Sequence, residues 1–265
     1  MSAPKWIELD GVVNMRDVGG LPTTDGSRVA SGRLLRSDNL QDLSDGDVAH
    51  LVDGLGVTDI VDLRSNVEVH LEGAGPLRAR DLVPHHHHSL LTDDEHDDPA
   101  AAALVLPWAK ESGRPEPPKR DDDHWASHYL GYLADRPDSV SAALEVVATS
   151  SGATVVHCAA GKDRTGTVVA MALSVAGVSD EDVVKDYVAT GERVERIVAR
   201  LMTRPAYEET LRDQPMSQHV PRPETMQRLL TVLAERHGGA AGWLREQGWS
   251  EDQVETLCRR LREPR

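Results

Sequence analysis

The chain has no phenylalanine and few other aromatic residues. Trp, Tyr and Phe together make up 3% of its 265 residues, so the side chains that usually bury most area per residue are scarce. Apolar residues nevertheless amount to 39% of the chain, which is enough for a hydrophobic core and excludes global disorder. The core must therefore be built mainly from Val, Leu, Ala and Ile.

Cysteine is also scarce, since Cys158 and Cys258 are the only two. Neither belongs to a CxxC pair or to a Cys/His spacing typical of zinc sites. Two cysteines make a poor disulfide framework for a secreted domain, so a reducing compartment fits better. Residues 1–10 contain no apolar run of the kind found in signal peptides, and no apolar stretch approaches the ~18 residues that cross a bilayer. The sequence thus predicts a cytoplasmic protein without a transmembrane segment.

Positive charge is in deficit, because the chain has 44 Asp and Glu residues but only 29 Lys and Arg residues, which gives a formal net charge of -15. Such a surface keeps a protein soluble and repels nucleic acid and anionic membranes in bulk. Nucleic acid is therefore excluded as a partner. A single small basic pocket is still compatible with this charge.

Strand and helix patterns alternate along the first two thirds of the chain. Short apolar pieces between turn residues predict strands and a hairpin over 11–36, and β-branched runs predict strands over 56–62 and 153–156. Helices are expected over 44–54, from Ser65 onward, over 124–149 and over 167–175, and the chain is expected to be helical from residue 178 to its end. This order predicts an α/β fold in one domain, 1–265, with a mainly parallel central sheet flanked by helices.

Residues 84–128 differ in composition from the rest and predict a lid-like insertion. They contain four consecutive histidines, an acidic run over 93–98 and several prolines, and inserted loops of this length often cover a site. A short strand is expected just before, over 81–83, ended by Pro84. Neighbouring side chains in an extended segment point to opposite sides, so His85 to His88 cannot converge simply on a metal. We expect a solvated loop there and no metal site.

The most informative segment is 157–166, His-Cys-Ala-Ala-Gly-Lys-Asp-Arg-Thr-Gly. It lies between a predicted strand and a predicted helix, where backbone N–H groups and the helix dipole favour an anion or a thiolate. Cys158 opens the loop and Arg164 closes it, with five residues between them, so the loop can curl around a phosphate. A nucleotide-binding Walker loop is excluded, because Asp follows Lys162 and the leading glycine is missing.

The expected chemistry is in-line attack of the Cys158 thiolate on phosphorus, followed by hydrolysis of a phosphocysteine. Arg164 and the loop amides would stabilise the charge of the transition state. The loop residues expected to bind phosphate are Ala159, Ala160, Gly161 and Lys162. We expect Thr165 to donate a hydrogen bond to the sulfur and His157 to order the loop rather than transfer protons.

These residues resemble the cysteine-dependent phosphatases of the protein tyrosine phosphatase superfamily. The loop is most similar to that of the bacterial tyrosine phosphatases also called atypical lipid phosphatases, with Lys and Asp beside the arginine. Further matches are residues 14–20, 35–37, 61–65 and the helical tail 238–261, although Met15 stands where the family commonly has Phe.

The resemblance implies one α/β phosphatase domain that needs no metal or cofactor. It further implies activity on phosphotyrosine or related phosphoesters, with phosphoserine, phosphothreonine and phosphoinositides as substrates of several relatives and inorganic phosphate as product. Some relatives carry a helical lid, and residues 89–128 occupy that place here.

The chain has no Trp-Pro-Asp loop, so the general acid must lie elsewhere in the sequence. Asp62 is the first choice, since it ends a strand expected to lie parallel to the one that ends at Cys158, at the edge where such folds build their sites. Asp163, inside the loop, is the second. Lys162 either binds a further substrate phosphate or is solvated, and Arg64 either points into the same cleft or pairs with an acidic neighbour.

Two other functions on the same loop remain alternatives. One is a phosphate-binding module without catalysis, although such a module would not need a thiolate. The other is sulfur transfer or arsenate reduction at a Cys–x5–Arg loop, which would not need Lys162 and Asp163.

Overall fold

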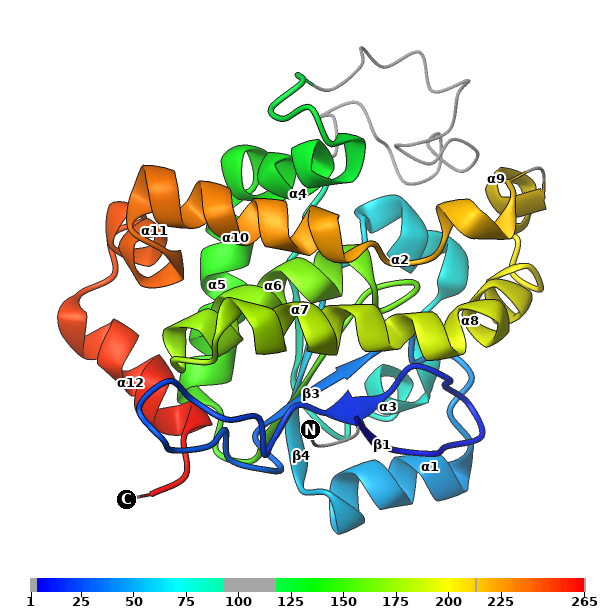
Figure 1. Ribbon diagram of the computed structural model, residues 1–265. Coiled ribbons are helices and arrows are strands. Elements are labelled where there is room, and N and C mark those ends of the chain that lie inside the picture. Colours follow the sequence, from blue (N-terminus) through cyan, green and yellow to red (C-terminus); the bar gives the residue numbers. More distant parts are fainter. Residues whose placement is uncertain (1–3, 93–117, 213, 265) are drawn as a thin grey trace.

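The computed structural model describes residues 4–92, 118–212 and 214–264, and its centre is one six-stranded sheet (Figure 1). The strands lie in the order β1-β2-β3-β6-β4-β5. The pairs β3–β6, β6–β4 and β4–β5 are parallel, whereas β1 and β2 extend the sheet antiparallel at one edge. Their bounds are Lys5–Trp6 (β1), Arg16–Asp17 (β2), Leu34–Ser37 (β3), Val57–Asp62 (β4), His85–His87 (β5) and Ala153–His157 (β6). The predicted α/β fold with a mainly parallel central sheet is thereby confirmed.

The central strands bury both faces, and successive side chains enter different cores. Leu34, Val61 and Val156 belong to one apolar cluster, whereas Leu35, Ile60 and Val155 belong to another. This alternation follows from the two-residue period of a strand. Strands that are apolar on both sides are typical of parallel sheets covered by helices on each face.

The larger core lies between the sheet and most of the helices. Its helices are α4 (His124–Asp135), α5 (Pro137–Thr149), α6 (Asp163–Val175), α7 (Asp180–Ala189), α10 (Pro223–His237), α11 (Ala240–Glu246) and α12 (Glu251–Leu261). The opposite core is covered by α1 (Asp45–Ala49), the π-helical turn η1 (His50–Gly54) and α3 (Gly75–Ala79). Figure 1 shows α1 and α3 on the side of the sheet away from α6 and α10.

A third, smaller apolar cluster supports the loop that follows β6. It joins Val67 of α2 (Asn66–Glu72), Ile197 and Leu201 of α8 (Val194–Leu201), Tyr207 and the loop residue Ala159. The remaining turns of helix are η2 (Thr190–Arg193), α9 (Glu208–Arg212) and η3 (Met216–Gln218).

Several helix starts follow the sequence expectations because capping is a local interaction. Ser44, Ser65 and Ser250 each accept a hydrogen bond from a backbone N–H three residues later, in complete capping boxes. The helix expected over 44–54 divides into α1 and η1, and the one expected over 124–149 divides at Pro137. Proline has no N–H and disfavours helical backbone in the residue before it, so Arg136 leaves the helix.

The expected strand at 81–83 and the expected solvated histidine loop were both wrong. The strand is instead β5, beyond Pro84, where His85 to His87 pair with residues 60–62 of β4. The histidine rings are engaged rather than solvated: His85 Nδ1 lies 3.0 Å from Val83 O, His86 Nε2 2.9 Å from Asp59, and His87 Nε2 2.7 Å from Arg64 O.

The described ends of the expected insertion at 84–128 thus belong to β5 and α4, and residues 93–117 lie outside the described residues. Within the described residues no group of His, Cys, Asp and Glu side chains is arranged to hold a metal. Among all the residues that the structure describes, no helix is long and apolar enough to cross a bilayer.

Candidate active site

Cys158 lies directly after β6, at the edge of the sheet where the parallel strands end. All five residues of β6 are buried, and α6 begins at Asp163, so the loop between them is fixed at both ends. The Cys158 side chain is buried, at 2% exposure, as is Arg164 at 7%. The predicted strand–loop–helix context of the Cys–x5–Arg loop is therefore present.

The backbone carbonyls of the loop are hydrogen-bonded from outside. Asn39 N donates to Ala159 O at 3.0 Å, Asn14 Nδ2 to Ala160 O at 2.9 Å, and Arg36 Nη2 to Gly161 O at 2.9 Å. The amide N–H groups of residues 159–162, in contrast, donate no hydrogen bond to any described residue. A loop whose carbonyls are occupied and whose amides are unoccupied is suited to bind an oxyanion.

Gly161 is required where this loop approaches β3. Its φ is +66°, and a Cβ built there would lie 2.4 Å from the carbonyl oxygen of Ser37 and 2.7 Å from the amide nitrogen of Asp38. No other residue fits both the conformation and the space.

A buried carboxylate behind the loop explains two of the motif matches. Asp186 of α7 accepts a hydrogen bond from Arg16 Nε at 2.9 Å and from Arg36 Nη1 at 2.5 Å. Arg16 in turn donates to Asn14 Oδ1 at 2.9 Å. Burial opposes ionisation of Asp186, but the two guanidinium groups outweigh it and lower the pKa of Asp186. Asn14, Arg16 and Arg36 therefore hold the loop from behind.

Arg164 is held by the carboxylate of Glu68, which also caps the start of α2. Glu68 Oε2 lies 2.5 Å from Arg164 Nη1 and Oε1 lies 2.9 Å from Nη2, a bidentate pair with fully buried oxygens. Tyr207 donates a hydrogen bond to Oε1 at 3.0 Å, and the Ser65 amide donates to Oε2 at 2.8 Å. Burial opposes the charge of Arg164, but Glu68 and then Cys158 raise the pKa of the guanidinium well above its usual value. Arg164 thus stays charged in a fixed orientation beside Cys158.

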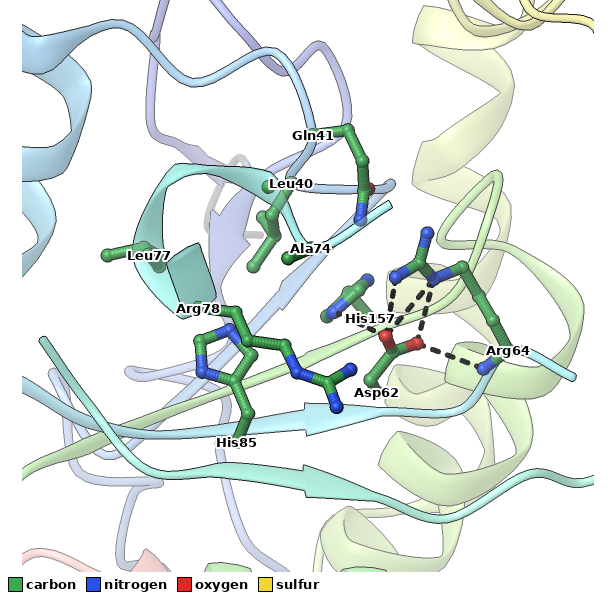
Figure 2. Close-up of a pocket in the computed structure, with 10 residues that line it drawn as sticks. Leu40, Gln41, Asp62, Arg64, Ala74, Leu77, Arg78, His85 and His157 are labelled. Carbon is green, nitrogen blue, oxygen red and sulfur yellow. Dashed lines mark hydrogen bonds and ion pairs between the residues drawn. The ribbon is translucent and has the colours of Figure 1, made fainter. Parts of the chain in front are cut away.

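Asp62 also lies at this edge, but its carboxylate is engaged. Figure 2 shows it between the guanidinium of Arg64 and the ring of His157. Arg64 donates to both Asp62 oxygens, from Nε at 2.9 Å and from Nη2 at 2.6 Å, and the Arg64 amide donates to Oδ1 at 3.1 Å. Burial alone would raise the pKa of Asp62, but the His157 and Arg64 side chains outweigh it and hold this pKa far below its usual value. Of the two readings of Arg64, the structure supports pairing with an acidic neighbour.

His157 is buried and neutral near pH 7. Burial lowers its pKa to about 4, despite the opposing charge of Asp62. Its Nδ1 lies 3.2 Å from the carbonyl of Cys158. These contacts suit the structural role expected for this residue.

The small cavity in Figure 2 is lined by Asp62, Arg64, His157, His85, Arg78 and Gln41, among others, and has a volume of about 10 Å³. This is room for about one water molecule. Cys158 and Arg164 are not among its lining residues, so a phosphoryl group on the nucleophile would not occupy it.

Asp163 occupies a different environment, on the side of the loop that faces α4. Tyr129 donates to Asp163 Oδ1 at 2.5 Å, and the Tyr187 hydroxyl lies 2.7 Å from that of Tyr129. Burial and then the Asp163 charge raise the pKa of Tyr129 well above its usual value, so Tyr129 remains a donor. The Asp163 side chain is 24% exposed, compared with 5% for Asp62.

Lys162 is largely enclosed rather than solvated. Its Nζ donates to the carbonyl of His219 at 2.9 Å, lies 3.6 Å from Asp163 Oδ1 and lies 5.4 Å from the centre of the Trp125 ring. The hydroxyl of Thr165 is buried and has no hydrogen-bond partner within residues 4–92, 118–212 and 214–264. The expected bond from Thr165 to the sulfur is thus not formed in this state.

Comparison with known proteins agrees with this geometry. A model of the tyrosine phosphatase family matches residues 7–263. The chain belongs to this family. It is 31% identical over 273 residues to the triple specificity protein phosphatase PtpB of Mycobacterium tuberculosis, covering 94% of this chain and 96% of that protein. A protein of Cupriavidus necator, named as a tyrosine-protein phosphatase, is 30% identical over 71% of this chain and 63% of its own length. A tyrosine-protein phosphatase of Nostoc commune is 28% identical over 52% of this chain and 49% of its own length.

The protein is accordingly a cysteine-dependent phosphatase, as the loop predicts. Sequence reasoning missed Glu68, Tyr207, Asp186 and Tyr129 as parts of this phosphatase site. The only available signal was the position of Glu68 three residues after Ser65, which also indicates a helix cap.

We expect Glu68→Gln to lower kcat/KM for p-nitrophenyl phosphate by about a hundredfold, because Arg164 loses its charged partner and its orientation. Vanadate inhibition should weaken in parallel. Tyr207→Phe removes one hydrogen bond to Glu68 and should have a smaller effect. The matched control is Glu72→Gln, since Glu72 is a buried carboxylate of the same helix that pairs with Arg204 instead. Equal losses in Glu68→Gln and Glu72→Gln would contradict the assignment.

The neutral His157 should make the protein less stable in acid. Because its folded pKa is about 4, the unfolded state takes up a proton first as the pH falls below about 6.5, and the free energy of unfolding should drop by about 3 kcal/mol by pH ~4. Asp62 adds little loss in this window, because most of its stabilisation is lost below about pH 4. Urea unfolding of wild type and His157→Gln at several pH values tests this. The variant should show a flatter dependence, and identical curves would refute the prediction.

Proposed function

We propose that the enzyme hydrolyses phosphate monoesters with Cys158 as nucleophile and Arg164 as phosphate clamp. The supporting observation is the Glu68–Arg164 pair beside a buried cysteine, in a loop whose carbonyls are engaged and whose amides are unoccupied. Residues 159–161 and Lys162 contribute the remaining donors to the phosphoryl oxygens.

The reaction has two displacements. The Cys158 thiolate forms an S–P bond while the P–O ester bond breaks, and a general acid protonates the leaving oxygen. A water molecule then attacks phosphorus and gives its proton to the same residue, now a base. The S–P bond breaks, inorganic phosphate leaves and the thiolate is regenerated. Thr165 has an unused hydroxyl next to Arg164 in the chain, which suits a donor to the departing sulfur.

We assign the general acid to Asp163 rather than to the sequence's first choice, Asp62. A general acid must be able to take up a proton and pass it to the leaving oxygen, which a buried carboxylate with both oxygens bound by a guanidinium group does poorly. The pKa of Asp62 is held far below its usual value, and both of its oxygens are bound by Arg64. Asp163 is in the loop itself and partly exposed, and Tyr129 fixes its orientation.

We propose phosphotyrosine in proteins as the principal substrate, with phosphoserine, phosphothreonine or phosphoinositides as further substrates. Family membership supports the first. The relative named a triple specificity phosphatase supports the wider range. Lys162 adds a second positive charge next to Asp163 in the loop, although its contact with His219 O must shift before it binds substrate. A reducing compartment such as the cytoplasm suits the nucleophilic thiolate.

Wild-type protein should turn over p-nitrophenyl phosphate in reducing, chelator-treated buffer, and Cys158→Ser should lose at least about a thousandfold in kcat. Cys258→Ser is the matched control and should retain full activity. A pure phosphate-binding module would bind vanadate or phosphate without turnover. A sulfurtransferase would prefer thiosulfate, and either result would contradict the proposal.

The general acid can be identified from how the rate of each variant depends on the leaving group of the substrate. Asp163→Asn should lower the rate on phenyl phosphate by about a hundredfold or more, and that on p-nitrophenyl phosphate much less, because the better leaving group needs little protonation. Tyr129→Phe should show the same pattern more weakly. Asp62→Asn should lower both rates equally through changed packing. The converse pattern, with leaving-group dependence in Asp62→Asn alone, would assign the acid to Asp62.

A further inference from the structure

Four arginine side chains gather near the start of strands β3 and β6, at the other end of the strands from Cys158. A groove of about 400 Å³ is lined by Arg33, Arg259, Arg260 and Arg262, together with small uncharged residues. Arg33 directly precedes β3, and Arg260 donates to the carbonyl of Gly152, which directly precedes β6. Five residues of β6 separate this edge from Cys158, a distance of about 16 Å. The groove is therefore separate from the catalytic site.

The composition of this groove is opposite to that of the whole protein. Acidic residues outnumber Lys and Arg by 44 to 29 along the chain. None of the described residues that line the groove is acidic, and four carry a guanidinium group. A local excess of this kind attracts anions that the rest of the surface repels.

Two of the guanidinium groups have unused donors. The guanidinium group of Arg33 has no hydrogen bond or ion pair with any residue the structure describes, although the Arg33 carbonyl accepts a hydrogen bond from Thr154 N. Arg260 Nε is buried and likewise has no partner among them. Burial and then the charge of Arg33 lower the pKa of Arg260, so the two positive charges repel each other. An anion between them would remove this repulsion and satisfy the unused donors.

The other two arginines differ in how firmly they are held. Arg259 lies 3.9 Å from Glu255, and both side chains are more than 60% exposed (67% and 63%), so this ion pair is weak. Its Nη2 also donates to Thr256 Oγ1 at 3.2 Å, a surface contact that leaves its other donors available. Arg262 pairs with Asp25 and so has a fixed position at the rim of the groove. Three guanidinium groups, those of Arg33, Arg259 and Arg260, can thus turn their donors to a ligand.

We propose that this arginine groove binds a small ligand that carries two phosphate groups. Planar guanidinium groups bind phosphate oxygens in pairs. Two phosphate monoesters carry about three to four negative charges near neutral pH, which matches the number of arginines. The volume lies in the range of small-molecule sites. The ligand is either free in solution or the headgroup of a phosphorylated lipid, and the chemistry recognised is the same in both.

Pyrophosphate is the soluble probe, and isothermal titration is the measurement. The test variant is Arg33→Gln/Arg259→Gln, which removes two guanidinium groups without breaking a buried contact. Its affinity for pyrophosphate should fall by about tenfold relative to wild type, because two charge-assisted contacts are lost. The rise in melting temperature with pyrophosphate should shrink in parallel, and kcat/KM for p-nitrophenyl phosphate should not change.

The matched control is Arg196→Gln/Arg236→Gln, which removes the same charge from exposed positions outside the groove. Both variants retain the catalytic loop, so pyrophosphate bound there contributes equally to each. Equal affinity of the two variants and wild type would overturn the proposal, even if the phosphatase activity is as proposed.

Vesicles of phosphatidylcholine, with and without phosphatidylinositol bisphosphate, identify the source of the ligand. Co-sedimentation that requires the phosphorylated lipid and is lost in Arg33→Gln/Arg259→Gln would indicate a headgroup site. Groove-dependent binding of pyrophosphate without binding to the vesicles would indicate a soluble ligand.

Discussion

The bidentate ion pair between Glu68 and Arg164 is the interaction on which the rest of the site depends. A guanidinium buried beside Cys158 can bind an anion there only if it keeps its charge and one orientation, and Glu68 provides both. Glu68 is itself held by the Ser65 amide and by Tyr207. A buried ion pair of this kind contributes little to net stability, because the desolvation of both groups offsets their attraction. Its value lies in placing donors where charge develops during the reaction.

Buried ion pairs also hold the Cys158–Arg164 loop from behind. Asp186 holds Arg16 and Arg36, and these hold Asn14 and the carbonyl of Gly161. Arg64 binds both carboxylate oxygens of Asp62 at the end of the neighbouring strand, β4. The catalytic loop therefore rests on two buried ion-pair networks that come from different parts of the chain. This explains why motifs at 14–20, 35–37 and 61–65 accompany the Cys–x5–Arg loop, since they supply the side chains of these networks.

The fold and the strand–loop–helix setting of the Cys–x5–Arg loop could be predicted because their signals are local. Serine caps three residues before a polar side chain mark helix starts, and the alternation of strands and helices indicates the α/β class. The strand at 85–87 was missed because its pairing depends on β4 rather than on its own histidines. Glu68 and Tyr207 could not be recognised because their contacts form only after the chain folds: Glu68 binds Arg164 from 96 residues away, and Tyr207 donates to Glu68. The engagement of Asp62 by Arg64 likewise depends on rotamers, which residue spacing does not determine.

Asp186 and Tyr207 connect the helical C-terminal part of the chain to the Cys–x5–Arg loop. Both residues lie in the helical C-terminal part, beyond residue 178, yet one holds the arginines behind the loop and the other holds Glu68. A fragment that ended at residue 178 would retain every residue of the signature loop and all strands of the sheet. It would still lack the groups that neutralise Arg16 and Arg36. The residues that hold Arg16, Arg36 and Glu68 therefore extend well beyond the segment that carries the recognisable motifs, and a chain that ended at residue 178 would keep Cys158 and Arg164 without them.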